Sequence, residues 1–445
     1  MMRRLLGLSM VVATFVGPEA TAQAPAAEAP PSAVATWLDG RQEQLQRLYT
    51  DLHAHPELSF QEIKTAGRIA EELKKAGAKV TTGVGELGVA GVIENGPGPV
   101  VLVRSDMDAL PVTERTGLPY ASRAKATDPL GREVGVMHAC GHDVHMTCLV
   151  GTANWLAEHK EAWSGTVVLI GQPAEETIGG ARKMLDDGLY KRFPKPDFAL
   201  ALHCKADGAA GEVFYRPGPM LASSTSLNVT IRGKGGHGAM PHLTVDPIAL
   251  AALAILDFQT IVSREVEPIQ PAVVTVGSIH GGQKHNIIAD EVKLQLTLRA
   301  YSEPVRQQLI KGIERRVEGL ARGHRAPAPS VEVQEHTPAT VNSPDLVARV
   351  APLLKRELGA NRVKLVDPVM GAEDFALFAE DDVPIMMFWI GTIDPGRIEE
   401  AKAKGIDLPG LHSALYHPEP RGAVAAGVRA MTAAVTGLLP PRADR

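Results

Sequence analysis

The chain has 445 residues, of which 44% are hydrophobic and 22% are charged, and its formal net charge is −5. This length allows roughly two or three domains of ordinary size. The negative charge, and the lack of a Lys/Arg cluster interleaved with aromatic residues, argue against a nucleic-acid partner.

The N-terminus has the features of a secretory signal peptide. Arg3 and Arg4 precede an apolar run over residues 5–16, and Ala22-Gln23-Ala24 offers the small residues that signal peptidases prefer. A short membrane anchor is the alternative, but the run is shorter than the ~18 apolar residues that a span needs. We therefore predict a signal peptide (1–24), a disordered tether (25–36), export to the periplasm or the medium, and no membrane span in the mature protein.

Helical and strand patterns alternate from residue 37 onward, which predicts an α/β fold. Ser59 and Glu62 have the spacing of a capping box at the start of a helix that runs towards Gly77. The expected apolar face of this helix consists of Ile63, Ala66, Ile69, Ala70 and Leu73.

Four short and almost wholly apolar runs follow, at residues 100–103, 167–170, 198–202 and 385–390. Strands that are buried on both faces, at the centre of a sheet covered by helices, have this pattern. Metal-type ligands come directly after the first three runs: Asp106 and Asp108, Glu175 and Glu176, and His203. Because ligands bind at the carboxyl ends of strands in open α/β sheets, the runs predict one shared site.

A second domain is predicted over residues 221–337. Its strand and helix patterns follow the order βαββαβ, the ferredoxin-like arrangement. The first of its helices begins at Asp246-Pro247, an N-cap followed by proline at the first helical position. Because stretches rich in proline and glycine bracket this segment, we interpret it as an insertion that divides the catalytic domain into residues 37–220 and 338–440.

The densest group of potential metal ligands lies around Cys140 and His142, which are separated only by Gly141. Thiolate and imidazole are both strong ligands for zinc-like ions, and a glycine between them would let the two side chains converge. Packed or solvent-facing residues are the alternative for such a cluster. With Cys148 and Cys204, Cys140 completes an odd and sparse set of cysteines that makes no disulfide framework.

Glu175 and Glu176 are adjacent carboxylates that repel each other unless a cation or a shared proton compensates. Their side chains diverge, so one can hold an ion while the other takes a proton from an activated water. A solvated acidic turn is the alternative. His203 and His412 add further ligands from distant parts of the chain, and Asp108, or Asp106, could orient a ligand imidazole.

Six stretches together resemble one known family, in the family's order along the chain. They are His53–Leu58, Ser105–Pro111, His138–Asp143, Gln172–Glu176, Gly233–His242 and Glu373–Phe375. The sequence is similar to the peptidase M20 family, and within it to the amidohydrolase branch. That branch contains hippurate hydrolases, plant indole-acetyl-amino-acid hydrolases and N-acetyl-diaminopimelate deacetylases.

The resemblance implies the roles of particular residues. Metal ligands are implied at Cys140, His142, Glu176, His203 and His412, and Glu175 is implied as the general base. It also implies two divalent ions, zinc or manganese, with cobalt as a further option; the Cys140 thiolate favours zinc. The implied fold is a phosphorylase/hydrolase-like mixed-sheet catalytic domain with helices on both faces, plus the inserted ferredoxin-like βαββαβ domain as a dimerisation lid.

The resemblance further implies roles for three residues of the lid. His237 would reach the active site of the partner in a homodimer and donate a hydrogen bond to the oxyanion, although a turn residue without a role is the alternative. Asn286 and Arg299 would hold the polar end of the substrate, since a guanidinium binds a carboxylate bidentately. Arg299 could equally be a surface ion-pair residue.

The expected function is metal-dependent hydrolysis of the amide bond of N-acyl amino acids. A carboxypeptidase or dipeptidase would use the same machinery with a different pocket. A binding relative that has lost catalysis is disfavoured, because all five ligands and Glu175 are present. Departures from the family pattern concern the pocket mouth: Cys204 replaces a more usual aliphatic residue, Ala289 stands where proline is frequent, and residues 393–408 form a longer and more charged segment.

Overall fold

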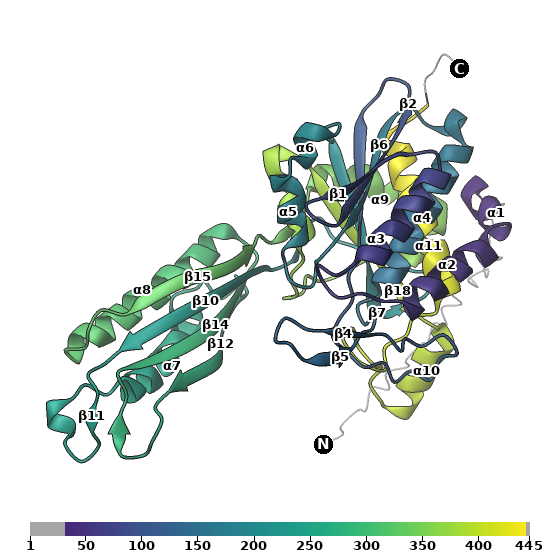
Figure 1. Cartoon of the computed structure of the whole chain (residues 1–445). Coiled ribbons are helices and arrows are strands. Elements are labelled where there is room, and N and C mark those ends of the chain that lie inside the picture. The colour runs from purple at the N-terminus through teal and green to yellow at the C-terminus, as the bar shows by residue number, and fades with distance from the viewer. Residues whose placement is uncertain (1–31, 442–445) are drawn as a thin grey trace, which may run out of the picture.

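The computed structural model describes residues 32–441, so the predicted signal peptide lies outside the described residues. Two bodies are visible in Figure 1: a large domain built on a mixed sheet, and an elongated inserted domain, here called the lid. The helices and strands of the lid lie between Ser223 and Thr337, within the predicted range 221–337.

The large domain contains an eight-stranded sheet in the order β1-β2-β6-β3-β7-β18-β8-β17. The four predicted apolar runs are its central strands β6, β3, β7 and β18, which are parallel to one another and mostly buried. The strands are β1 (Lys79–Val84), β2 (Gly88–Asn95), β3 (Val100–Asp106), β6 (Gly165–Gln172), β7 (Phe198–Ala209), β8 (Val213–Tyr215), β17 (Val363–Leu365) and β18 (Ile385–Ile393).

Helices cover both faces of this sheet, which confirms the predicted architecture. One apolar core lies beneath α1 (Ala33–Asp39), α2 (Gln42–Ala54), α3 (Ile63–Lys75), α4 (His142–Glu158), α9 (Pro344–Leu358) and α11 (Pro420–Leu438). A second core on the other face involves α5 (Gly180–Asp186), α6 (Leu189–Arg192) and the 3-10 segment η4 (Asp374–Asp382). The smaller elements are β4 (Lys125–Thr127), β5 (Glu133–Gly135), α10 (Pro395–Lys404), η1 (Lys160–Ala162) and η3 (Ala360–Arg362).

The predicted tether is wrong at its C-terminal end, because α1 already begins at Ala33. Ser32 caps this helix, since its hydroxyl accepts a hydrogen bond from the Ala35 backbone N–H at 3.1 Å. Val34 and Leu38 are buried, and the helix packs on α11. Apolar burial therefore orders residues whose Ala/Pro-rich neighbourhood suggests disorder.

The predicted capping box is also wrong. α3 begins at Ile63, and neither Ser59 nor Glu62 caps it through a side chain. The Ser59 hydroxyl donates to Asp108 Oδ2 at 2.6 Å, and Glu62 Oε1 accepts from the Ala174 backbone N–H at 2.8 Å. Ile63 is exposed, whereas the other four residues of the predicted apolar face are buried. Tertiary contacts around the strand ends take the two polar side chains away from the helix.

The lid has the predicted βαββαβ order, with an antiparallel sheet in the strand order β12-β14-β10-β15. Both helices pack on this sheet around one apolar core. The elements are β10 (Ser223–Arg232), α7 (Pro247–Arg264), β12 (Ala272–Gly281), β14 (Glu291–Ala300), α8 (Glu303–Gly323) and β15 (Ser330–Thr337). Asp246 caps α7 as predicted. Among the described residues, α7 alone is long and apolar enough to cross a membrane, and one of its faces packs in the lid core.

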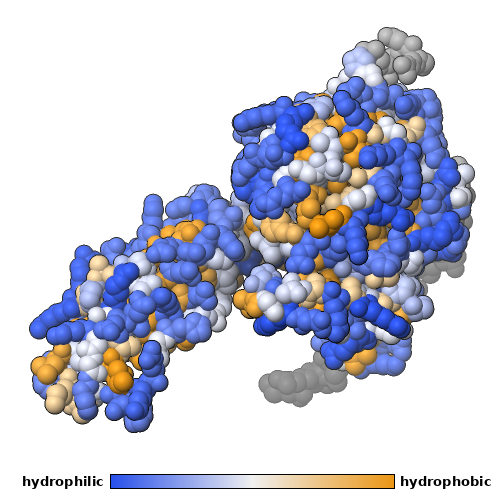
Figure 2. All heavy atoms as spheres, viewed as in Figure 1, coloured by the Kyte–Doolittle hydropathy of each residue, from blue (hydrophilic) through white to orange (hydrophobic). Residues whose placement is uncertain are grey.

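Two small strand pairs complete the lid and its connection. β9 (Gly218–Leu221) pairs with β16 (Thr340–Asn342) where the chain enters and leaves the lid. β11 (Gly236–His237) pairs with β13 (Ile287–Ile288), close to the short turn η2 (Pro241–Leu243). Figure 1 places β11 at the tip of the lid, remote from the large domain. Hydrophobic groups are visible on this tip in Figure 2, and exposed apolar side chains in or next to these segments include Met240, Leu243 and Ile287.

Candidate metal centre and active-site cleft

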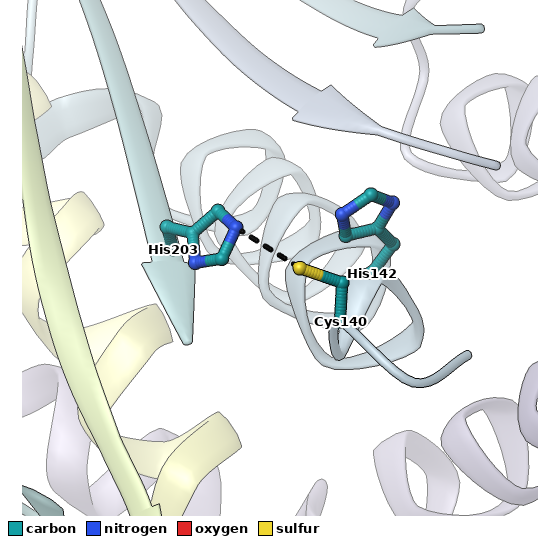
Figure 3. A group of neighbouring side chains, drawn as sticks. All are labelled: Cys140, His142 and His203. Atoms are coloured by element: carbon teal, nitrogen blue, oxygen red, sulfur yellow. Dashed lines mark hydrogen bonds between the residues drawn. The ribbon is translucent and has the colours of Figure 1, made fainter. Parts of the chain in front are cut away.

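Cys140 and His142 converge because the backbone turns sharply at Gly141, directly before α4. Gly141 has φ +83°, a left-handed conformation, and an added Cβ would lie 2.7 Å from Cys204 Sγ. Glycine meets both demands of this position. Cys140 Sγ lies 3.5 Å from His203 Nε2, which projects from β7, and the His142 ring lies beside them (Figure 3).

The Glu175-Glu176 pair follows β6 and faces the same histidines. Glu176 Oε1 is 3.8 Å from His142 Nε2 and 3.6 Å from His412 Nε2. Glu175 Oε2 is 3.9 Å from His142 Nε2. Three overlapping groups have ligand atoms within 4.8 Å of one another: Cys140-His142-His203, Cys140-Glu176-His412 and His142-Glu175-Glu176. All five predicted metal ligands and Glu175 therefore surround one small volume.

Buried polar atoms without partners show that this volume fits divalent cations. His142 Nε2 and Glu176 Oε1 are buried, and neither has a hydrogen-bond partner among the described residues. Buried polar atoms are normally paired, so orphaned nitrogen and carboxylate atoms that face each other need a further partner. A thiolate, imidazoles and a carboxylate are the donor set of zinc-like ions. The residues present therefore fit a metal centre.

Asp108 orients two of the predicted ligands. His142 Nδ1 lies 2.8 Å from the backbone oxygen of Asp108 and 3.3 Å from Asp108 Oδ1, which directs Nε2 towards the centre. The same carboxylate accepts hydrogen bonds from the Ser59 hydroxyl and, at 3.0 Å, from the Glu176 backbone N–H. Such contacts fix the tautomer and the direction of a ligand imidazole.

A wide cleft opens from the centre, with a volume of about 1040 Å³. Glu175, the potential ligands Cys140, Glu176, His203 and His412, and Arg299 all line it. Arg299 reaches it from the end of β14 in the lid. Partial burial lowers the pKa of Arg299 from its ordinary value. One cleft is thus lined both by the possible metal ligands and by the Arg299 guanidinium of the lid.

Residues 102–413 match the family described as Peptidase family M20/M25/M40. The chain belongs to this family. It is 36% identical over 345 residues to thermostable carboxypeptidase 2 of Saccharolobus solfataricus (77% of this chain, 84% of the relative). It is 35% identical over 343 residues to hippurate hydrolase of Campylobacter jejuni (76% and 86%). In structure it is similar to the Bacillus subtilis YXEP protein, a dinuclear metal-binding peptidase of the M20 family. The TM-score is 0.73 and the sequence identity is 29%, and the match covers 89% of this chain and 98% of that one.

This M20 protein is therefore a metal-dependent hydrolase of amide bonds. Its cleft contains an acidic group whose protonation is shifted by the surroundings. Burial, together with the negative charges of Glu373 and Glu176, raises the pKa of Glu175 above its usual range. A raised pKa suits a carboxylate that takes up and releases a proton during catalysis.

Sequence reasoning assigned no role to Arg104, which the structure places behind the cleft. Arg104 is fully buried and donates hydrogen bonds to Asp106 Oδ2 at 2.7 Å, Glu373 Oε1 at 2.6 Å and Asp374 Oδ1 at 3.1 Å. Carboxylate oxygens of Glu175, Glu373 and Asp374 lie within 4.8 Å of one another. The sequence offered one indication: Arg104 directly follows the predicted buried run 100–103, and a buried cation needs acidic partners.

His145 is a second residue that sequence reasoning left without a role. Its Nδ1 lies 2.6 Å from Asp106 Oδ1, and its Nε2 accepts a hydrogen bond from the Cys204 backbone N–H at 2.8 Å. His145 therefore fixes the backbone of β7 at Cys204, the residue that follows His203. Its position one helical turn after His142 could have indicated that both rings lie on one face of the helix.

The structure does not bring His237 and Asn286 to the cleft of their own chain. His237 belongs to β11 at the tip of the lid (Figure 1), where it is exposed. Asn286 is adjacent, because its backbone oxygen accepts a hydrogen bond from the Gly238 N–H at 2.9 Å. Their predicted contact with substrate is therefore not made within this chain.

Proposed function

We propose that this protein hydrolyses the amide bond of N-acyl amino acids, with Glu175 as the general base. The convergence of Glu175 with five potential metal ligands, in a cleft that Arg299 also lines, carries this proposal. The C. jejuni relative supports the substrate class, because its name refers to hippurate, which is N-benzoylglycine.

The proposed metal centre consists of two divalent ions, held by Cys140, His142, Glu176, His203 and His412. Zinc or manganese suits these donors, and the Cys140 thiolate favours zinc. When bound, such ions make a water molecule more acidic and polarise the scissile carbonyl.

Glu175 performs the proton transfers in this proposal. Its carboxylate takes a proton from the attacking water and then delivers that proton to the nitrogen of the leaving amine. Burial, together with the negative charges of Glu373 and Glu176, raises its pKa, which favours the protonated form that acts as the acid. Arg299 binds the free carboxylate of the amino-acid part through its guanidinium. Each residue thus acts on a different part of one substrate.

Carboxypeptidase activity is the second candidate, because the S. solfataricus relative is named a carboxypeptidase. A short peptide also presents an amide bond next to a free carboxylate, so the same cleft could hold it. Comparing hydrolysis of N-acyl amino acids and dipeptides that share one C-terminal residue separates the two candidates.

We further propose that the protein is exported and works as a homodimer in which the lid tip meets the partner. The charged and apolar N-terminal pattern supports export. The exposed apolar residues around β11 support an interface, because clustered apolar side chains on a surface mark contact sites. Fractionation of cells that express the full chain tests the location: protein of full length confined to the cytoplasm would contradict export.

Substitution Glu175→Gln tests the central assignment. We expect turnover of an N-acyl amino acid to fall by ~10²–10⁴-fold, since general bases contribute this much, while metal content stays close to wild type. Steady-state kinetics and elemental analysis measure the two quantities. The control is Glu161→Gln, at an exposed carboxylate outside the cleft, which should leave both unchanged. A Glu175→Gln enzyme that keeps more than about a tenth of its activity would show that another group is the base.

A further inference from the structure

The turn between β6 and α5 bears two glutamates of the cleft on a strained backbone. It consists of residues 173–180 and is here called the glutamate turn. Ala174 and Ile178 have φ +51° and +55°, in the left-handed region that favours glycine, and for the β-branched isoleucine this is a clear outlier. Such conformations persist only where the surrounding structure holds them, and they gather at functional sites. The contacts that hold this turn therefore bear on the position of Glu175.

Three buried carboxylates, each from a different part of the large domain, accept hydrogen bonds from the backbone of the glutamate turn and of the residue after it. They belong to the start of α3, to the segment after β3 and to η4. The acceptors, with their donor residues, are Glu62 for Ala174 at 2.8 Å, Asp108 for Glu176 at 3.0 Å, and Asp374 for Ala181 at 3.0 Å. These bonds act near the beginning, in the middle and at the end of the turn, so they fix its backbone along its length.

Glu62 differs from the other two carboxylates, because the second oxygen of its carboxyl group is unpaired. Asp108 also accepts from Ser59, and Asp374 also accepts from Arg104. Glu62 Oε2, in contrast, is buried and has no hydrogen-bond partner among the described residues. Burying a polar atom without a partner costs stability. The contribution of Glu62 therefore lies in the bond from its other oxygen to the residue before Glu175.

The bond to Glu62 affects Glu175 more directly than it affects Glu176. The Glu176 backbone N–H has an acceptor of its own, Asp108, which fixes this potential metal ligand independently. The chain before Glu175 depends on Ala174, which is held in a left-handed conformation against its own preference. Without the acceptor, Ala174 relaxes towards an ordinary conformation and redirects the Glu175 side chain. Loss of Glu62 should thus displace the proposed base and leave the potential ligands in place.

We infer that Glu62 is a positioning residue for the general base: its carboxyl oxygen holds the Ala174 N–H and thereby aims the Glu175 carboxylate into the cleft. The inference rests on the proposed function, in which Glu175 is the base. Glu62 itself does not line the cleft, so it acts on catalysis through Glu175.

Two substitutions of Glu62 test this role. Glu62→Met removes the acceptor at a similar side-chain length, and kcat for an N-acyl amino acid should fall by roughly 10²-fold, the effect of misplacing a catalytic group by about 1 Å. KM and metal content should stay close to wild type. Burial and the negative charge of Asp108 raise the pKa of Glu62 to about 7, so the neutral amide of Glu62→Gln resembles the native group and keeps an oxygen for the Ala174 N–H. This second variant should retain most of the wild-type kcat.

A double-mutant cycle separates a positioning role from a structural one. In the Glu175→Gln background, Glu62→Met should lower the residual kcat by less than about twofold, because the effects of residues that act as a unit are not additive. A loss as large as in the wild-type background would overturn the inference, and so would a wild-type kcat for Glu62→Met alone. Glu62→Asp, whose carboxyl group is one methylene shorter, takes the place of Glu62→Met if that variant does not fold.

The matched control is Glu419→Met, which removes a different carboxylate that accepts backbone hydrogen bonds. Glu419 lies outside the cleft and caps α11 through bonds from the Arg421 N–H at 3.0 Å and the Gly422 N–H at 2.7 Å. This variant should lower the melting temperature and leave kcat unchanged. A loss of kcat equal to that of Glu62→Met would show that destabilisation alone explains the effect, which would overturn the inference.

The proposed function and the inference fail in different ways. Wild-type enzyme that cleaves dipeptides but no N-acyl amino acid would overturn the proposed substrate, and the same cycle measured on a dipeptide would then decide the role of Glu62. Glu175→Gln enzyme with full activity on either substrate would overturn the proposed base and the role of Glu62 with it.

Discussion

At the scale of single residues, Arg104 compensates the negative charge of carboxylates that are buried behind the cleft. It is a fully buried cation in contact with three acidic side chains, and one of these, Glu373, neighbours Glu175 in the cleft. Buried charges are costly to desolvate, and only close pairing compensates for that cost. Removal of the cation would leave these buried carboxylates without the positive charge that compensates them.

We therefore expect Arg104→Met to lower the free energy of unfolding by about 3–5 kcal/mol, the usual cost of breaking a buried ion pair. Urea denaturation of the two proteins at the same pH measures this difference. Arg182→Met is the control, because Arg182 pairs with Asp186 and Glu380 on the surface and should contribute less than about 1 kcal/mol. Equal losses in the two variants would contradict this account of Arg104.

At the scale of elements, the start of α4 determines the geometry of the proposed metal centre. Gly141 turns the chain so that Cys140 from the preceding turn and His142 from the helix face one another. The close approach of Cys204 Sγ leaves no room for a side chain at that point. The junction between loop and helix therefore aligns two potential ligands, and β7 supplies a third, His203.

Substitution Gly141→Ala should consequently weaken metal binding. A left-handed alanine costs about 1–2 kcal/mol of backbone strain, and the clash with Cys204 must displace Cys140 or β7. Gly77→Ala isolates the strain, because Gly77 has φ +79° and nothing within 4 Å of its added Cβ. Titration with zinc or manganese should show a loss of affinity for Gly141→Ala only. Equal affinities would mean that the clash is relieved without moving the ligands.

At the scale of the whole molecule, the lid divides the predicted site between two places. Arg299 reaches the cleft of its own chain, while His237 lies at the opposite end of the lid (Figure 1). β9 and β16 pair where the chain enters and leaves the lid, and in this arrangement His237 lies far from the predicted metal ligands of its own chain. The proposed homodimer resolves this separation, because the tip of one lid can then contact the other chain.

Mixing two inactive variants tests this arrangement. His237→Ala and Glu175→Gln should each lower turnover when pure, because each removes one component of every site. After dissociation and reassembly of equal amounts, about half of the dimers are hybrids, and each hybrid has one of its two sites with both His237 and Glu175. About a quarter of the wild-type activity should therefore return in the mixture. Size-exclusion chromatography with light scattering verifies the dimer. Recovery no greater than the sum of the two pure variants would argue against a shared site.

The sequence by itself determined the elements whose pattern is local. The four apolar runs predicted the central strands, because burial on both faces leaves a continuous apolar run. Asp246-Pro247 likewise predicted the start of α7, since an N-cap acts within one helical turn.

Only the tertiary structure decided how distant polar side chains pair. Ser59 and Glu62 have the spacing of a capping box, yet Asp108 and the Ala174 N–H take their hydrogen bonds. Arg104 and Glu373 are 269 positions apart, so no local pattern links them. Likewise, α1 is ordered by its contact with α11, near the other end of the described chain. Such pairings depend on which strand ends and helices meet in space. A local sequence pattern does not specify these long-range contacts.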